Sequence, residues 1–257
     1  MTDLLKRFVS KQAIVTGGAS GIGQAIAQRL ASEGAAVHLF DRDAKAAGLV
    51  VAEIESKGGE AQAHLVDVAS QESVAAAVAS IDQIDVLVNS AGIAAIGNLA
   101  ETTSEEMDRV YAVNVKGVYH CMREALPKLE ASAGGAILNL ASIASHVGIQ
   151  DRFAYSMSKG AVLSMTLSMA RDYLAAGIRC NCISPARVHT PFVESYLERN
   201  YPDNKKEMFD KLAAYQPMGR MGTPAEIAGL AAFLCSSEAA FITGAAYAID
   251  GGVINLR

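Results

Sequence analysis

Short apolar runs alternate with longer amphipathic segments along most of the chain. Apolar runs of about four to eight residues between turn-forming residues are typical of buried strands, and longer segments with a period of about 3.6 residues are typical of helices. The pattern predicts strands over residues 13–17, 36–41, 61–68, 84–92, 135–142, 178–185 and 246–252, and helices over 22–32, 44–56, 70–79, 105–129 and 155–176. Buried strands that alternate with helices indicate a parallel sheet covered on both faces. We therefore predict an α/β fold, a doubly wound parallel sheet (Rossmann fold), in a single domain over residues 1–257.

The composition excludes several classes of protein. Hydrophobic residues make up 51% of the chain and charged residues 19%, as in a globular protein and unlike a disordered one. The net charge is −5 and no strong basic patch is visible, which argues against a nucleic-acid partner. No apolar run reaches the ~18–20 residues that span a bilayer, and a signal-peptide pattern is lacking, so we expect a cytoplasmic protein without a membrane partner.

Four cysteines, Cys121, Cys180, Cys182 and Cys235, fit no common zinc-binding spacing. We expect them to be buried free thiols and expect no metal site, as in a protein of a reducing compartment.

The sequence TGGASGIG, residues 16–23, lies between the first predicted strand and the first predicted helix. Gly17, Gly21 and Gly23 allow a tight turn and a close approach of the backbone to a ligand. The N-terminus of the following helix supplies unpaired N–H groups and partial positive charge. This arrangement predicts a site for the pyrophosphate of a dinucleotide, beyond the carboxyl ends of the strands.

Asp41 ends the second predicted strand, where a carboxylate can accept hydrogen bonds from the adenosine ribose. The same charge repels a 2′-phosphate, so we predict NAD as the cofactor. Arg42 follows directly, and a guanidinium there could hold the 2′-phosphate of NADP instead.

Tyr155 and Lys159 lie four residues apart in a predicted helix and therefore on one face. A free tyrosine titrates near ~10, which makes it a poor base at neutral pH. A cation about 4 Å away contributes about 4 kcal/mol at an effective dielectric constant of ~20, equivalent to ~3 pKa units. Lys159 and a positively charged nicotinamide ring together could thus make Tyr155 an acid/base catalyst. Ser142 ends a predicted strand, and its hydroxyl can orient the substrate oxygen.

Together these motifs resemble the short-chain dehydrogenase/reductase family over essentially the whole chain. The resemblance rests on TGGASGIG, on NSAG at 89–92, on Asn114 in VNVKG, on Ser142, on YSMSK at 155–159 and on SPARVHTP at 184–191. The chain departs from the family pattern at Ser90, where asparagine is usual, and at Ala186, where glycine is usual. The resemblance implies an oxidoreductase that acts on alcohol or ketone groups.

The resemblance also implies roles for individual residues. Asn114, Ser142, Tyr155 and Lys159 would form a catalytic tetrad, in which Asn114 bends a helix and holds a water linked to Lys159. Asp67 would bind the adenine amino group, Asn89 would line the adenosine side, and Val188 and Thr190 would contact the nicotinamide carboxamide. The full set of implied cofactor contacts is Gly17, Ser20, Gly21, Ile22, Gly23, Asp41, Asp67, Val68, Asn89, Ala91, Gly92, Tyr155, Lys159, Pro185, Val188 and Thr190. The family usually forms homotetramers, so we expect one here.

The segment 187–216 reads as two short amphipathic helices around Pro202 and is predicted to close over the substrate as a lid. Arg187 lies beside the expected nicotinamide site, where a guanidinium suits a carboxylate. His146 and Gln150 lie in the loop after Ser142 and could bind substrate hydroxyls, together with Ser142 and Tyr155. A surface or interface salt bridge for Arg187 and a solvated loop for His146 and Gln150 are the structural alternatives.

The run PARVHTPF resembles that of dehydrogenases acting on sugar acids, such as 2-keto-3-deoxy-L-fuconate, so we favour a hydroxylated carboxylate as the small-molecule substrate. A 3-hydroxybutyrate-type dehydrogenase, a polyol dehydrogenase and a 3-oxoacyl-carrier-protein reductase are alternatives. A protein that binds NAD without catalysis is a further alternative, against which the complete tetrad argues.

Overall fold

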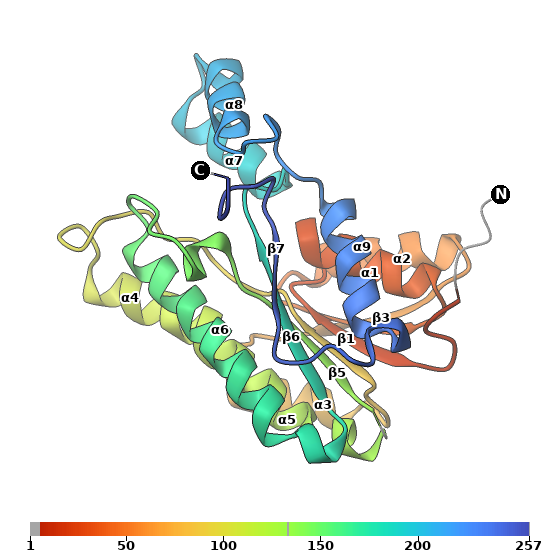
Figure 1. Ribbon diagram of the computed structural model, residues 1–257. Helices are drawn as coiled ribbons and strands as arrows, with labels where there is room; N and C mark the ends of the chain where they lie inside the picture. Colours follow the sequence, from red (N-terminus) through yellow and green to blue (C-terminus); the bar gives the residue numbers. More distant parts are fainter. Residues whose placement is uncertain (1–5, 133, 257) are drawn as a thin grey trace.

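The sheet has seven parallel strands in the order β3-β2-β1-β4-β5-β6-β7 (Figure 1). The computed structural model describes residues 6–132 and 134–256. The strands are β1 Gln12–Thr16, β2 Ala36–Asp41, β3 Glu60–Leu65, β4 Val86–Asn89, β5 Ala136–Leu140, β6 Arg179–Pro185 and β7 Ala246–Ile249. The order reverses between β1 and β4, so the carboxyl ends of these two strands border the crevice in which ligands of such sheets bind.

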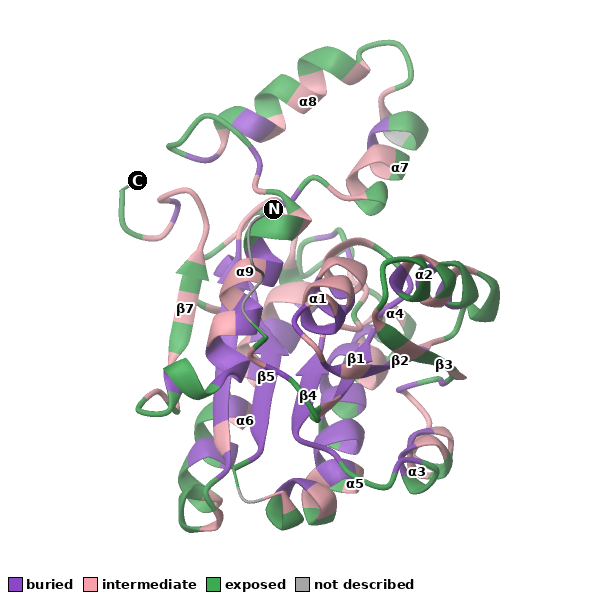
Figure 2. Cartoon of the chain, turned by 90° about the vertical axis from the view of Figure 1, so that its right-hand side faces the viewer, coloured by how far each residue is buried: buried purple, intermediate pink, exposed green. Residues whose placement is uncertain are grey.

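Helices cover both faces of this sheet. They are α1 Gly21–Ser32, α2 Ala44–Ser56, α3 Gln71–Ala79, α4 Ser104–Tyr111, α5 Gly117–Ala131, α6 Phe153–Asp172, α7 Pro191–Asn200, α8 Lys205–Ala214 and α9 Pro224–Cys235. Alternate residues of a strand point to opposite faces, and β1 shows the consequence. Val15 packs in the cluster shared with α1, α2 and α9, while Ile14 packs in the cluster shared with α3, α5 and α6. The predicted doubly wound parallel sheet is thus confirmed, and its central strands are buried on both faces (Figure 2).

The predicted helix over 105–129 is not one regular helix. The helix runs from α4 through a π-helical turn, Ala112–Lys116, into α5. A π turn adds one residue to the local repeat and turns later side chains to a new direction, and such turns are frequent at functional sites. Asn114 lies at the centre of this turn.

Helix α9 is absent from the predicted elements. Its apolar residues surround most of the helix because it is buried between α1 and the sheet, so no amphipathic period marks it. A local signal was present nonetheless. Thr223 accepts a hydrogen bond from the backbone N–H of Glu226, Glu226 bonds back to the N–H of Thr223, and Pro224 occupies the first turn. This is a capping box, which a search for T-x-x-E would have found.

Helices α7 and α8 stand beyond the carboxyl ends of the strands, apart from the layers that cover the sheet (Figures 1 and 2). They agree with the two helices expected on either side of Pro202. The chain enters this pair directly from β6 and returns through residues 215–223 to α9. Helices attached at both ends to the ligand-binding edge of the sheet are in position to cover a ligand.

The four cysteines are free and buried, as expected. Burial raises the pKa of the Cys121 thiol to about 12 and that of Cys235 to about 12, so both remain protonated at neutral pH. Within residues 6–132 and 134–256, no helix is long and apolar enough to cross a bilayer, and no cluster of His, Cys, Asp or Glu side chains could hold a metal ion.

Candidate active site

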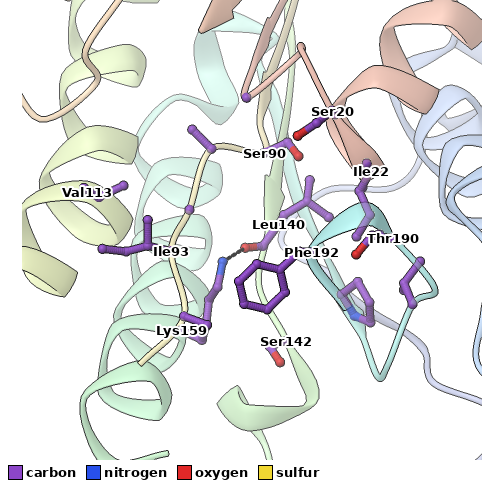
Figure 3. Close-up of a pocket in the computed structure, with 18 of the residues that line it drawn as sticks. Ser20, Ile22, Ser90, Ile93, Val113, Leu140, Ser142, Lys159, Thr190 and Phe192 are labelled. Atoms are coloured by element: carbon purple, nitrogen blue, oxygen red, sulfur yellow. Dashed lines mark hydrogen bonds between the residues drawn. The ribbon is translucent and has the colours of Figure 1, made fainter. Parts of the chain in front are cut away.

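A cavity of about 560 Å³ opens beyond the carboxyl ends of the strands, between the sheet and the start of α7 (Figure 3). This volume is in the range of small-molecule and cofactor sites. The following predicted site residues line it: Gly17, Ser20, Gly21, Ile22, Gly23, Asp41, Asp67, Val68, Ala91, Gly92, Ser142, Tyr155, Lys159, Pro185, Arg187, Val188 and Thr190. The fold thus brings together residues at the carboxyl ends of six strands, β1 to β6, and residues of helix α6.

The glycine-rich turn has no room for larger residues. A Cβ atom on Gly23 would lie 2.1 Å from the carbonyl oxygen of Gly17, and one on Gly17 would lie 2.9 Å from Cα of Ala91. Gly17 and Gly21 also have φ values of +64° and +56°, which side chains disfavour. The turn therefore packs tightly on the loop after β4 and leaves the first turn of α1 facing the cavity.

Thr16 joins these two loops, a role that the sequence did not indicate. Its hydroxyl accepts hydrogen bonds from the backbone N–H groups of Ser90 and Ala91, each at 3.0 Å. Both bonds use the backbone, so serine at position 90 is compatible with the loop geometry. Among the described residues other than glycine, only Ser10 and Asp151 have positive φ, so alanine at position 186 also fits without strain.

Asp41 is both structural and exposed to the cavity. Its carboxylate oxygens accept hydrogen bonds from the backbone N–H groups of Ala19 and Asp43, each at 3.0 Å. Each oxygen retains acceptor capacity, since a carboxylate offers about four lone-pair sites. Arg42 lines the same part of the cavity. Asp67 follows β3 and also lines the cavity. Asp67 is not the N-cap of α3, since Ser70 has that role.

Tyr155, Lys159 and Ser142 meet on one wall of the cavity. The ammonium of Lys159 lies 5.8 Å from the ring centroid of Tyr155 and donates a hydrogen bond to the carbonyl of Leu140 at 2.6 Å, the dashed line in Figure 3. Ser142 comes two residues after Leu140, and its hydroxyl accepts a hydrogen bond from the N–H of Ala144 at 3.2 Å. Helix α6 and the end of β5 are therefore held together where the catalytic groups lie.

The protein alone does not lower the pKa of Tyr155. Burial raises that pKa, while the hydrogen bond with Ser142 and the positive charge of Arg152 oppose the rise. Burial also lowers the pKa of Lys159 to about 8. The lowering of the Tyr155 pKa that we expect from Lys159 and a nicotinamide ring together is not produced by the protein alone, in which burial is the largest effect on the phenol. A cation bound in the cavity would have to supply the remaining decrease in the pKa of Tyr155.

Asn114 is a buried polar bridge. Its side-chain oxygen accepts from the N–H of Ile93 at 2.8 Å, and its amide donates to the carbonyl of Ile93 at 2.9 Å and to the hydroxyl of Ser158 at 3.0 Å. A Cβ on Gly92 would lie 3.3 Å from the Asn114 oxygen. Asn114 lies at the predicted bend but does not line the cavity itself; it fixes the loop after β4 against α6, next to Lys159.

Besides Asn114, three predicted residues do not line the cavity. Asn89 points to the opposite face of its strand from Val88, is 2% exposed and donates a hydrogen bond to Asn139 at 2.8 Å, so it joins β4 to β5 instead of facing the adenosine site. The exposed His146 hydrogen-bonds with the hydroxyl of Ser184 at 2.9 Å. Gln150 is exposed in the same loop. These three side chains lie outside the cavity, so their positions do not agree with the ligand contacts expected of them.

Other residues line the cavity without having been predicted. Arg152 precedes α6, Phe192 begins α7 and Tyr215 follows α8. Figure 3 shows Phe192 among the side chains that surround the cavity, with Lys159 and Ser142. A regular helical period gives no sign of these positions, since each lies at an element boundary. The sequence contains one indication of Arg152: it is a charged residue three positions before Tyr155 and directly follows an aspartate at a turn.

The chain matches the family model described as Enoyl-(Acyl carrier protein) reductase over residues 17–254. It is 39% identical over 247 residues to "Dehydrogenase/reductase SDR family member 6" of Aquarana catesbeiana, which covers 96% of this chain and 98% of the relative. It is 37% identical over 251 residues to "2-(S)-hydroxypropyl-CoM dehydrogenase 3" of Xanthobacter autotrophicus, again covering 96% of this chain and 98% of the relative.

Solved structures agree with these relatives. The L-sorbose reductase of Gluconobacter frateurii, solved with NADPH and L-sorbose, superimposes with a TM-score of 0.93 at 30% identity, covering 99% of both chains. Levodione reductase gives a TM-score of 0.91 at 30% identity, covering 96% of this chain and 98% of that one. The family match, the sheet order and the cavity residues agree, and the chain belongs to the short-chain dehydrogenase/reductase family.

Proposed function

We propose that this protein is an NAD-dependent dehydrogenase that transfers a hydride between the CH–OH carbon of a hydroxylated carboxylate and the nicotinamide. One observation carries the proposal: Tyr155, Ser142 and Lys159 line the same cavity as the glycine-rich turn and Asp41. A substrate oxygen beside the phenol therefore lies in the same space as a bound dinucleotide. The whole segment 6–256 around this cavity acts as one catalytic domain in this proposal.

The cavity fits a nicotinamide dinucleotide. The tight packing of Gly17 and Gly23 keeps the first turn of α1 on the cavity wall, where its N–H groups would face an anionic pyrophosphate. Asp41 would hold the ribose, Asp67 the adenine, and Val188 and Thr190 the carboxamide end. The dinucleotide supplies hydride transfer, the chemistry that side chains do not provide.

The residues on the Tyr155 wall supply the proton chemistry. In alcohol oxidation, the ionised phenol oxygen of Tyr155 takes the hydroxyl proton of the substrate, and in ketone reduction the neutral phenol returns it. Ser142 donates a hydrogen bond to the substrate oxygen, where negative charge develops. Lys159 retains two N–H donors beyond its bond to Leu140, so it can bind cofactor hydroxyls and place its positive charge near the phenol. Asn114 holds the loop at Ile93 in place.

The preference for NAD rests on Asp41. A 2′-phosphate next to this carboxylate would meet a like charge, whereas a free ribose diol would find hydrogen-bond acceptors. Arg42 at the same end of the cavity is the feature that would favour NADP. We place Asp41 first because it is fixed by two backbone hydrogen bonds, while Arg42 is exposed.

The choice of a hydroxylated carboxylate rests on Arg187. Its Nε atom is buried without a hydrogen-bond partner among the described residues. A buried N–H group without an acceptor has lost its hydrogen bonds to water and has no protein bond in their place. A bound anion would supply the missing acceptor. Residues 187–216, containing α7 and α8, would form the lid over this substrate.

A turnover screen tests the proposal. Purified protein is assayed for NADH formation with NAD⁺ and, separately, for NADPH formation with NADP⁺, against hydroxy acids, sugar acids and polyols. We expect NAD-linked oxidation of at least one acid. Absence of turnover with both cofactors across the panel, in protein that binds NADH, would support binding without catalysis instead.

A homotetramer is part of this proposal. Tyr119 of α5 and Leu167 of α6 are 43% and 47% exposed, and β7 forms an edge of the sheet. These are the surfaces through which we expect subunits to associate. Light scattering coupled to size exclusion measures the mass directly; a monomer of 26.9 kDa would contradict the expectation.

A further inference from the structure

Two guanidinium groups, those of Arg152 and Arg187, line the cavity on the side of α7 and α8. They come from distant parts of the sequence: Arg152 directly precedes α6, and Arg187 follows β6. Neither forms an ion pair with a carboxylate within residues 6–132 and 134–256. Positive charges that are close and unneutralised in a partly dehydrated cavity are costly without an anion.

The two groups act on each other electrostatically. Burial lowers the pKa of Arg187, and the positive charge of Arg152 lowers it further. The same charge of Arg152 acts on Tyr155 and on Tyr196 of α7. Arg152 is therefore within electrostatic reach of the catalytic phenol, of the lid residue Tyr196 and of Arg187.

The backbone fixes the position of Arg152. Asp151 has a φ of +55°, in the left-handed region that residues other than glycine rarely adopt. Its carbonyl accepts hydrogen bonds from the N–H of Gly97 at 3.0 Å and from the Arg152 guanidinium at 2.7 Å. Strained residues held by several contacts cluster at functional sites. Here the turn directs the chain into α6 with Arg152 facing the cavity.

Aromatic side chains from the lid segment complete this surface. The guanidinium of Arg187 lies 5.6 Å from the ring centroid of Tyr215, in the range of a cation–π contact. Stacking on a ring orients a guanidinium and leaves its edge available to a planar anion. Tyr215 follows α8 and lines the cavity, so an anion bound at Arg187 would lie next to the lid segment.

We propose that Arg152 and Arg187 together bind the carboxylate of the substrate, and that this pair makes the enzyme select hydroxy acids over neutral alcohols. The inference rests on the proposed function and adds Arg152 as a specificity-determining residue. One carboxylate held by two guanidiniums leaves the carbinol free to reach Tyr155 and Ser142. The anion bound by the two arginines is a carboxylate of the substrate itself, in the part of the cavity next to the lid segment.

Matched substrate pairs test this selection. Glycerate and glycerol, 3-hydroxybutyrate and 1,3-butanediol, and gluconate and sorbitol each differ by one carboxylate in place of a hydroxymethyl group. For wild-type protein with NAD⁺, we expect a higher kcat/KM for the acid in at least one pair. Equal or better use of the neutral member in every pair would overturn the inference while leaving the dehydrogenase function intact.

Variants then assign the preference to the two arginines. Arg152→Met and Arg187→Met should each lower kcat/KM for the preferred acid by roughly 10- to 100-fold, as expected for loss of a charge-assisted hydrogen bond. Turnover of the neutral partner should change little in Arg187→Met, and in Arg152→Met it should fall less than that of the acid, because the charge of Arg152 also acts on Tyr155. The double variant should lose less than the product of the single losses, because both groups bind one carboxylate. Arg152→Lys should recover part of the loss.

Arg171→Met removes an exposed guanidinium from the far end of α6 and is the control for charge.

Equal losses on acid and neutral substrates would show a structural role and overturn the inference, as would strictly multiplicative losses. A binding measurement separates this from the proposed function. Calorimetry of the same acids with the NADH complex should show binding that Arg152→Met and Arg187→Met weaken. Arginine-dependent binding without any turnover would support the anion site and contradict the dehydrogenase function.

Discussion

The ammonium of Lys159 is held by the main-chain carbonyl of Leu140 at 2.6 Å. This bond joins α6 to the last residue of β5, two residues before Ser142. It fixes the lysine one helical turn after Tyr155, with its remaining donors toward the cavity. The lysine is therefore both a support for the catalytic wall and a source of charge in it.

Replacing Lys159 tests this double role. Lys159→Met should lower kcat by roughly 10²-fold or more, because the phenol loses a nearby cation, and should weaken NADH binding. Stopped-flow turnover and fluorescence titration measure the two effects. Lys206→Met, on the exposed face of α8, is the control and should behave as wild type. Unchanged turnover in Lys159→Met would contradict the assigned role.

The glycine turn gives a sharp steric prediction. Gly23→Ala should destabilise the protein by about 1–3 kcal/mol and weaken NADH binding, since its Cβ would meet the Gly17 carbonyl at 2.1 Å and force the turn to move. Gly48→Ala is the matched control: Gly48 lies inside α2, and no atom lies within 4 Å of an added Cβ. That change should be neutral or stabilise by about 0.5–1 kcal/mol. Denaturant unfolding measures both.

Cofactor choice depends on Asp41. The ratio of kcat/KM for NAD⁺ to that for NADP⁺ should exceed one, and Asp41→Ala should lower this ratio by roughly tenfold, the effect of one interaction of about 1.4 kcal/mol. Asp43→Ala, which removes a carboxylate two residues further on at the cap of α2, should leave the ratio unchanged. A wild-type preference for NADP⁺ would identify Arg42 as the selecting residue.

Stability should fall at mildly acidic pH because of the buried His38, which contacts the half-buried His64. His38 hydrogen-bonds with Gln12 at 2.7 Å and with His64 at 3.0 Å, and burial and the charge of His64 lower its pKa from 6.5 to about 4. The unfolded chain therefore binds a proton before the folded protein does. The contribution of His38 is complete above pH ~6.5 and is lost as the pH falls toward ~4, by up to about 3 kcal/mol.

Urea unfolding at several pH values between ~6.5 and ~4.5 measures this slope, above the range in which most carboxylates titrate. His38→Gln keeps polar groups near Gln12 and His64 without titrating and should flatten the slope. An equal slope in wild type and variant would show that other groups cause it.

Most of the sheet could be predicted because its strands are short, apolar and bounded by turns. The strand around residue 86 extends over Val86–Asn89 and not 84–92, since pairing with β1 and β5 ends there and the chain turns toward the cavity. Helix α9 was not predicted because burial on most sides removes the amphipathic period. The hydrophobic period gave no sign of the π turn at Asn114, and only the family resemblance implied a bend there.

The same distinction holds for the site. Residues that follow strands, such as Gly17, Asp41 and Ser142, line the cavity as expected because parallel strands end on one edge. Asn89 does not, because the strand alternation directs it to the α5 and α6 face. Arg152 was not predicted since its direction depends on the left-handed turn at Asp151. A contact that depends on the conformation of a loop produces no hydrophobic period in the sequence.

The central claim is that Tyr155 is the acid/base of a dehydrogenase, and Tyr155→Phe tests it most directly. The variant removes one oxygen and keeps the ring beside Lys159. With the best substrate of the screen, we expect nearly complete loss of turnover, with NADH affinity and unfolding midpoint close to wild type. Ser142→Ala should be less severe, with a loss of roughly 10²–10³-fold, as for removal of one donor to a developing oxyanion. A Tyr155→Phe protein that keeps a substantial fraction of wild-type kcat would contradict the account.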